Sequence, residues 1–131
     1  MASIYTTIRQ LLETHLSNIE GIPVIAYENV DFKPTVGTPF VSCMMLPVSR
    51  RPAVRGLNPT QRYDGIFAVN CYSNEGYGPA GSDQTVDKIL NAFDATTDIG
   101  SLSIDYSERD QGSVDTPWFI VPVNIGWHIY N

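Results

Sequence analysis

The residues Gly76-Tyr77-Gly78-Pro79-Ala80-Gly81 match the spacing G-x-G-x-x-G. In dinucleotide-binding proteins this pattern turns the chain tightly after a strand and directs backbone N–H groups at a pyrophosphate. Here Pro79 has no N–H to donate, and Asp83 and Asp87 place negative charge at the start of the following helix, where a phosphate would bind. The pattern therefore predicts a flexible loop. A small-ligand-binding or enzymatic domain that uses Gly76–Gly81 is the alternative from another functional class.

The remaining reactive side chains do not form a recognisable site. Cys43 and Cys71 lie in strand-like segments, away from the helix N-termini that activate thiols, and with His15 and His128 they lack the spacing of a structural zinc site. There is no G-x-S-x-G elbow, and the carboxylates are scattered. We expect no catalytic residues, no metal and no cofactor. Both cysteines are expected to be buried thiols in a reducing compartment, and a disulfide stays open if their strands are neighbours.

The best-patterned stretch runs from Tyr63 to Phe93. Residues Tyr63–Tyr72 are rich in apolar and aromatic side chains, which favours a strand inside a sheet. A loop of small residues over 73–81 follows, and then apolar residues recur at helical spacing. These are Val86, Ile89, Leu90 and Phe93. Ser82 or Asp83 is the expected N-cap, because either side-chain oxygen can accept a free first-turn N–H.

The rest of the chain adds one helix and four strands. Ser3 can cap a helix that reaches about Glu20, with Gly21 as its C-cap. The strands are expected at residues 24–28, 40–47, 102–107 and 118–130. The strand from Phe40 is apolar on both faces, which predicts a central position, and Pro122 marks an edge or a bulge because it cannot donate to a ladder.

These elements predict an α+β fold: a mainly antiparallel mixed sheet of about five strands, with two amphipathic helices packed on one face. With 131 residues, of which 43% are hydrophobic, the chain is expected to be a single domain spanning 1–131. Exposed loops are expected near 49–62, 73–81 and 107–116. The order of the strands cannot be derived from the sequence.

The charge of the chain limits its partners. The net charge is −6, with 14 acidic and 8 basic residues, which disfavours tight nucleic-acid binding, since such binding depends on Lys and Arg neutralising phosphates. No apolar run approaches the length of a membrane span, and the N-terminus does not have the pattern of a signal peptide. We therefore expect neither membrane association nor secretion.

Half of the basic residues lie in one segment, 49–62: Arg50, Arg51, Arg55 and Arg62. One interpretation is a solvated hairpin tip. The other is a protein contact, since arginine binds carboxylates in bidentate geometry and the rest of the chain has 14 acidic residues against 4 basic ones. Charge separated in this way suits a head-to-tail ring or stack of identical subunits.

The order of these parts resembles the small tail terminator, or tail completion, proteins of long-tailed bacteriophages, including the lambda-like type. The resemblance rests on the N-terminal helix, the run Gly37-Thr38-Pro39-Phe40-Val41 that leads into a strand, the arginine-bearing hairpin before Tyr63–Val69, the glycine-rich loop with helix 82–93, and the aromatic C-terminal strand. It covers nearly the whole chain, and none of these motifs is a catalytic signature.

This resemblance implies a structural, non-enzymatic virion protein, assembled in the host cytoplasm and located in the tail at its head-proximal end. It would form a homo-oligomeric, hexameric ring that caps the tail tube, ends tube polymerisation and joins the head. Its partners would be the tube protein and a neck protein, with DNA only as passing cargo. Arg50, Arg51, Arg55 and Arg62 would contact the next subunit or the tube. Asp105, Glu108, Asp110 and Asp115 would face the lumen or the opposite partner, and a head-completion or neck connector protein is the alternative of the same class.

Overall fold

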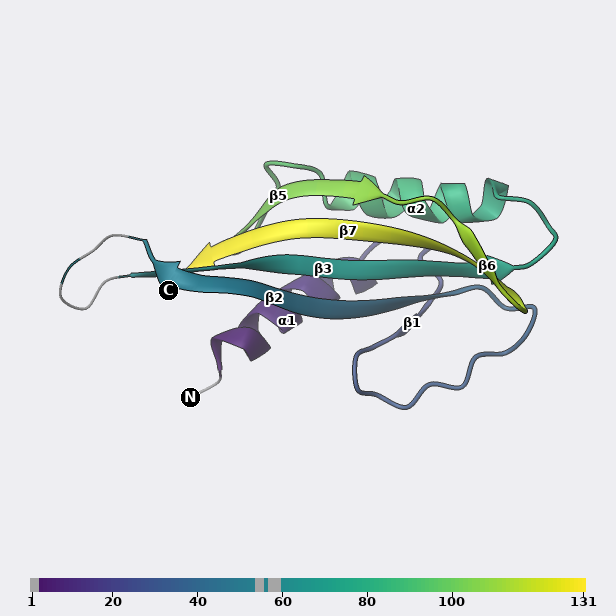
Figure 1. The fold of residues 1–131 in the computed structure, drawn as a ribbon, viewed down its shortest axis with the longest axis horizontal. Helices are drawn as coiled ribbons and strands as arrows, with labels where there is room; N and C mark the ends of the chain where they lie inside the picture. The colour runs from purple at the N-terminus through teal and green to yellow at the C-terminus, as the bar shows by residue number, and fades with distance from the viewer. Residues whose placement is uncertain (1–2, 54–55, 57–59) are drawn as a thin grey trace.

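The computed structural model describes residues 3–53, 56 and 60–131, and they form an α+β fold (Figure 1). The helices are α1 (Ile4–Ser17) and α2 (Ala80–Ala92), and the strands are β1 (Val24–Ala26), β2 (Phe40–Pro52), β3 (Gln61–Asn74), β4 (Asp98–Ile99), β5 (Leu102–Arg109), β6 (Ser113–Asp115) and β7 (Trp118–Tyr130). The strand order is β1-β2-β3-β7-β5-β4, with β6 paired to β7. The described sheet thus has seven strands rather than about five, and β1 runs parallel to β2 while the other pairs are antiparallel.

Alternate residues of the long strands point to one buried face of the sheet. On β3 these residues include Phe67, Val69 and Cys71, and their neighbours on β7 are Ile125, Val123 and Val121. Both helices bury their apolar stripes in the same core cluster, which explains the predicted packing on one face. Their buried residues are Ile8, Leu12 and Leu16 from α1, and Val86 and Ile89 from α2.

The ends of the helices differ from the sequence prediction, except at Ser3. The Ser3 hydroxyl accepts a hydrogen bond from the Tyr5 N–H at 3.2 Å and caps α1 as expected. Helix α1 ends at Ser17, before Gly21, whose φ of +75° belongs to a following turn. Helix α2 begins at Ala80, so neither Ser82 nor Asp83 is its N-cap; the buried Ser82 hydroxyl lies 2.6 Å from the Ser73 hydroxyl instead.

Strand β2 is not central along most of its length. Its partner β1 covers only Phe40–Ser42, because β1 is three residues long. Beyond that point the Glu28 carboxylate accepts the Met45 N–H at 3.1 Å, so a side chain takes the place of a neighbouring strand. The apolar residues on the second face of β2 are exposed rather than sandwiched because both helices pack on the first face, and Met44 keeps 48% of its surface.

Strand β7 is central, between β3 and β5, so Pro122 does not mark an edge. No register shift occurs between β3 and β7, where Pro122 pairs with Asn70. The proline is tolerated because it lies in a gap between the two partners on that side of β7. The pairing of β7 with β5 reaches as far as Val123, and its pairing with β6 reaches as far as Ile120. Between them the Pro122 carbonyl accepts the Asp110 N–H at 2.9 Å.

Two of the expected loops are shorter than predicted. Strand β2 extends to Pro52 and strand β3 begins at Gln61, so residues 49–52 and 61–62 of the 49–62 segment are paired in a hairpin. Strands β5 and β6 likewise occupy part of 107–116. The hairpin end and the C-terminus lie at one end of the elongated molecule (Figure 1). Within the described part of the chain, no helix has the length and apolar character needed to cross a membrane.

Candidate functional site

The β2–β3 hairpin concentrates guanidinium groups around one carboxylate. Arg51 and Arg62 lie directly opposite each other in the register, a like-charge pairing that is unfavourable by itself. Asp64 lies between them: its Oδ2 is 3.7 Å from Arg51 Nη2 and 3.4 Å from Arg62 Nε. A hydrogen bond from Ser49 and these two arginines hold the pKa of Asp64 below its usual value.

Arg50 lies on the other side of the same hairpin. Its Nε donates to the Tyr63 hydroxyl at 3.0 Å, and its guanidinium carbon is 5.7 Å from the centre of the Tyr63 ring. Tyr63 is in turn fixed by an edge-on contact with Tyr5. Arg50 thus has a defined position but no carboxylate partner among the described residues. Arg55 falls outside the residues that the structure describes.

The predicted acidic residues separate into two groups. Asp105 and Glu108 lie on β5, and Asp110 follows directly. Asp105 is the extra residue of a bulge between Ile104 and Tyr106, and its carboxylate lies 2.6 Å from His128 Nδ1. Asp110 accepts a hydrogen bond from Asn124 at 3.1 Å, whereas no partner of the Glu108 carboxylate is found in the described part of the chain.

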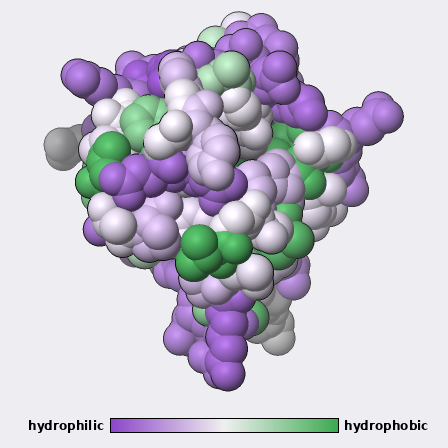
Figure 2. Space-filling view, turned by 90° about the vertical axis from the view of Figure 1, so that its right-hand side faces the viewer, coloured by the Kyte–Doolittle hydropathy of each residue, from purple (hydrophilic) through white to green (hydrophobic). Residues whose placement is uncertain are grey.

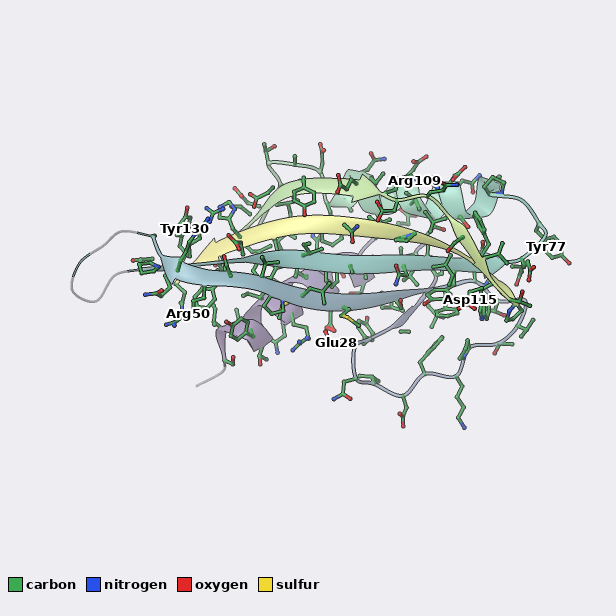
Figure 3. All side chains as sticks on the ribbon, in the orientation of Figure 1. Glu28, Arg50, Tyr77, Arg109, Asp115 and Tyr130 are labelled. Carbon is green, nitrogen blue, oxygen red and sulfur yellow. The ribbon has the colours of Figure 1, made fainter. Side chains whose placement is uncertain are left out.

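Asp115 belongs to the opposite end of the molecule. It lies on β6, and Figure 3 places it near Tyr77, far from Arg50 and Tyr130. Seen end-on in Figure 2, that end has separate hydrophobic patches within a largely hydrophilic surface. The structure therefore assembles three of the four predicted acidic residues and leaves Asp115 apart from them.

The sheet has an exposed apolar surface that was not predicted from the sequence. We call it the open face, and it consists of the side chains on the side of the sheet away from the helices. Its central row is Leu46, Ile66 and Gly126, with Tyr106 over Gly126. A signal for it was present, because the Phe40–Leu46 strand is apolar on both sides, but that pattern was interpreted as a central strand.

The other candidate residues do not form a reactive site. Burial raises the pKa of Cys43 and of Cys71 to about 12, and both thiols are free. His15 Nε2 lies 2.7 Å from the Ala92 carbonyl oxygen, which joins the two helices. Among the described residues no group of three or more His, Cys, Asp or Glu side chains could hold a metal.

The glycine-rich loop also lacks the geometry of a phosphate site. Gly76 and Gly78 adopt positive φ values of 89° and 78°. The carboxylate of Asp83 occupies the first turn of α2 and pairs with Arg109 at 2.6 Å. A carboxylate at this position repels a phosphate.

The comparisons with known proteins identify the fold and the family. One solved structure superposes with a TM-score of 0.67 over 96% of this chain and 92% of the other, at 17% sequence identity, which establishes a shared fold. No curated protein sequence matches the chain. The sequence pattern of the family described as phage tail terminator protein matches residues 7–127, nearly the whole chain, and the protein therefore belongs to the phage tail terminator family.

Proposed function

We propose that this protein forms a ring of six copies that caps the phage tail tube at its head-proximal end. The ring ends polymerisation of the tube protein and offers the surface to which a neck protein and the filled head join. Membership of the family supports a structural role in the tail. The separation of charge in the fold supports the ring, because surfaces of opposite sign at different places on one subunit suit head-to-tail contacts.

The observation that carries the proposal is the excess positive charge at the hairpin. Three described arginines, Arg50, Arg51 and Arg62, are balanced there by the single carboxylate of Asp64. Exposed charges of one sign, held by a paired hairpin, steer and orient a partner of opposite sign. In this assembly the hairpin contacts the next subunit or the tube protein.

The acidic remainder of the chain suits a channel that DNA crosses without being bound. The chain has a net charge of −6, and phosphates are held by Lys and Arg rather than by carboxylates. We assign the four acidic residues to surfaces that face the lumen or the opposite partner: Asp105, Glu108 and Asp110 to one surface, and Asp115 to a separate one. DNA is thus cargo and not a ligand.

The test is negative-stain electron microscopy of the protein alone and mixed with its tail-tube protein. Rings with a central hole, or short tubes that carry a cap, are the expected result. Tubes of unlimited length beside isolated small particles would contradict tail termination. Recovery of the protein with heads, but not with tails made without heads, would assign it to the neck instead.

A further inference from the structure

The open face of the sheet brings together exposed apolar residues from two strands. Four apolar side chains that line its centre remain exposed: Met44 by 48%, Leu46 by 41%, Val48 by 66% and Tyr106 by 40%. They come from strands β2 and β5, which lie on either side of β3 and β7. An apolar patch of this kind on a small domain marks a surface that another protein covers.

A shallow groove crosses this face. Its volume is 240 Å³, and its lining includes Val48, Ile66, Tyr106 and Gly126. Drug-sized ligands occupy pockets of about 300–1,000 Å³, so the groove is better matched to a side chain of a partner protein than to a free ligand.

Tyr106 lies in this groove, and two carboxylates of β5 are close to it in sequence: Asp105, which also lines the groove and contacts His128, and Glu108. A Cβ atom added to Gly126 would lie 2.1 Å from Tyr106 Cε1, which means that the ring rests directly on the glycine backbone. Asp105 precedes the tyrosine, and Glu108 lies two residues further on the same face of β5, beside Asn124. An aromatic ring with carboxylates beside it is suited to a guanidinium, which stacks on the ring and donates to the oxygens.

The chain itself supplies a matching guanidinium. Arg50 is exposed, is positioned by Tyr63 and has no described carboxylate partner. It points to the helix side of the hairpin, because it pairs with the inward-facing Tyr63, whereas the groove opens on the opposite side of the sheet. A second copy can therefore lay its hairpin over the open face, and a rotation of about 60° repeated at each contact closes a ring of six.

We propose that the open face binds the hairpin of a second copy of this chain, with Arg50 of that copy on Tyr106 between Asp105 and Glu108. This inference rests on the proposed ring and names the two surfaces that form it. At the Tyr106 part of this face, Asp105 and Glu108 would repel a nucleic acid or an anionic membrane, whereas the arginines of the same face, Arg51 and Arg62, lie at the hairpin end and contact Asp64. The hairpin of another copy has the required opposite charge.

The test is intermolecular disulfide formation in the full-length variant Arg50→Cys/Glu108→Cys, performed with and without tail tubes. Within one chain, β2 and β5 are three strand spacings apart, about 14 Å, and a disulfide needs Cα atoms within about 7 Å. Any bond between the new cysteines therefore joins two copies. Under mild oxidation we expect a ladder that extends beyond the dimer, up to the ring size.

Controls separate this contact from random oxidation. The single-cysteine variants and the unmodified chain, whose own thiols are buried, should give no ladder. The matched variant Arg50→Cys/Asp87→Cys places the second thiol on an exposed helix position and should also give none. A ladder in that control, or products that stop at the dimer, would overturn the head-to-tail arrangement.

Charge exchange provides a second readout. Arg50→Glu and Glu108→Arg should each raise the concentration needed for half-assembly at least tenfold in sedimentation velocity, and the double variant should return it towards that of the parent. Lys33→Glu, which changes the charge equally in an exposed loop, is the control for Arg50→Glu. Singles that assemble like the parent, or a double variant no better than the singles, would refute the contact.

Tube length distinguishes the inference from the function on which it rests. Capped tubes of limited length without a cysteine ladder would overturn the hairpin-on-face contact and leave tail termination standing. A ladder on tubes that keep growing would support the contact and refute termination. Failure of both readouts would refute both.

Discussion

Two glycines on neighbouring strands should respond very differently to a single added methyl group. A Cβ on Gly65 would lie 2.4 Å from the Leu46 carbonyl oxygen and 2.6 Å from Trp127 Cζ2. For a Cβ on Gly126 the three nearest atoms all belong to the ring of Tyr106, and that side chain is 40% exposed. A backbone oxygen between paired strands cannot rotate away, whereas an exposed ring can.

The magnitudes follow from this difference. Alanine in place of glycine in a strand is worth about 0.5–1 kcal/mol in backbone entropy, and overpacking of a core costs about 1–3 kcal/mol or more. For Gly65→Ala the clash dominates, and we expect a loss of about 2–3 kcal/mol, about a 30- to 140-fold change in the unfolding equilibrium at about 1.4 kcal/mol per factor of ten. For Gly126→Ala the two effects nearly cancel, and we expect a change below about 1 kcal/mol.

The assay is urea unfolding followed by far-UV circular dichroism, with an unchanged slope against urea required of every variant. Gly81→Ala is the control, because nothing lies within 4 Å of its added Cβ and alanine favours the helix that it occupies; it should be neutral or stabilising. Equal losses for Gly65→Ala and Gly126→Ala would refute the distinction between backbone and side-chain clashes.

Three further measurements test the local chemistry. Folding lowers the pKa of Asp64. The stability that this carboxylate adds is therefore complete above the unfolded pKa near 4 and is lost as the pH falls through the folded pKa. In urea unfolding, the difference in stability between the parent and Asp64→Asn should close between about pH 5 and pH 2. The thiolate is the nucleophilic form of cysteine, and burial raises the pKa of Cys43 and of Cys71 to about 12. Iodoacetamide at pH 8 should therefore label neither thiol until urea unfolds the chain, and mass spectrometry measures the labelling. Ser3→Ala removes the cap of α1 and should cost about 1 kcal/mol in the same urea assay.

The elements with long, regular patterns were predictable from the sequence. Strand β7 was expected at residues 118–130 and occupies Trp118–Tyr130, because its alternation extends over 13 residues. Strands β4 and β6 were not predicted, since two or three residues carry no usable periodicity. The parallel pairing of β1 also depends on contacts distant in sequence and has no local signal.

The candidate site was only partly predictable for the same reason. The sequence identified Arg50 and Glu108 as charged residues in exposed segments, but not which side of the sheet each faces. The bulge between Ile104 and Tyr106 decides that for β5, because one extra residue changes the face to which the following side chains point. The contact of Asp105 with His128 likewise joins residues that are 23 positions apart.

Strand β2 was predicted to be central but has an exposed apolar face, and this difference bears on the association that we propose. An apolar strand with two apolar faces can be buried within one subunit or between two subunits, and sequence periodicity is the same in both cases. Here the outer edge of β2 is closed by β1, by the Glu28 carboxylate on the Met45 N–H and by Pro47, which has no N–H. The apolar face remains open.

Strand β5, on the other side of the sheet, is protected differently. It carries a bulge at Asp105 and the charged residues Glu108 and Arg109, features by which natural sheets discourage pairing with another strand. Edge-to-edge extension of the sheet is thus disfavoured on both sides. The contact that we propose, through the face and with a charged hairpin to fix its direction, allows a ring to close at a fixed number of copies, where edge pairing would permit an open-ended sheet.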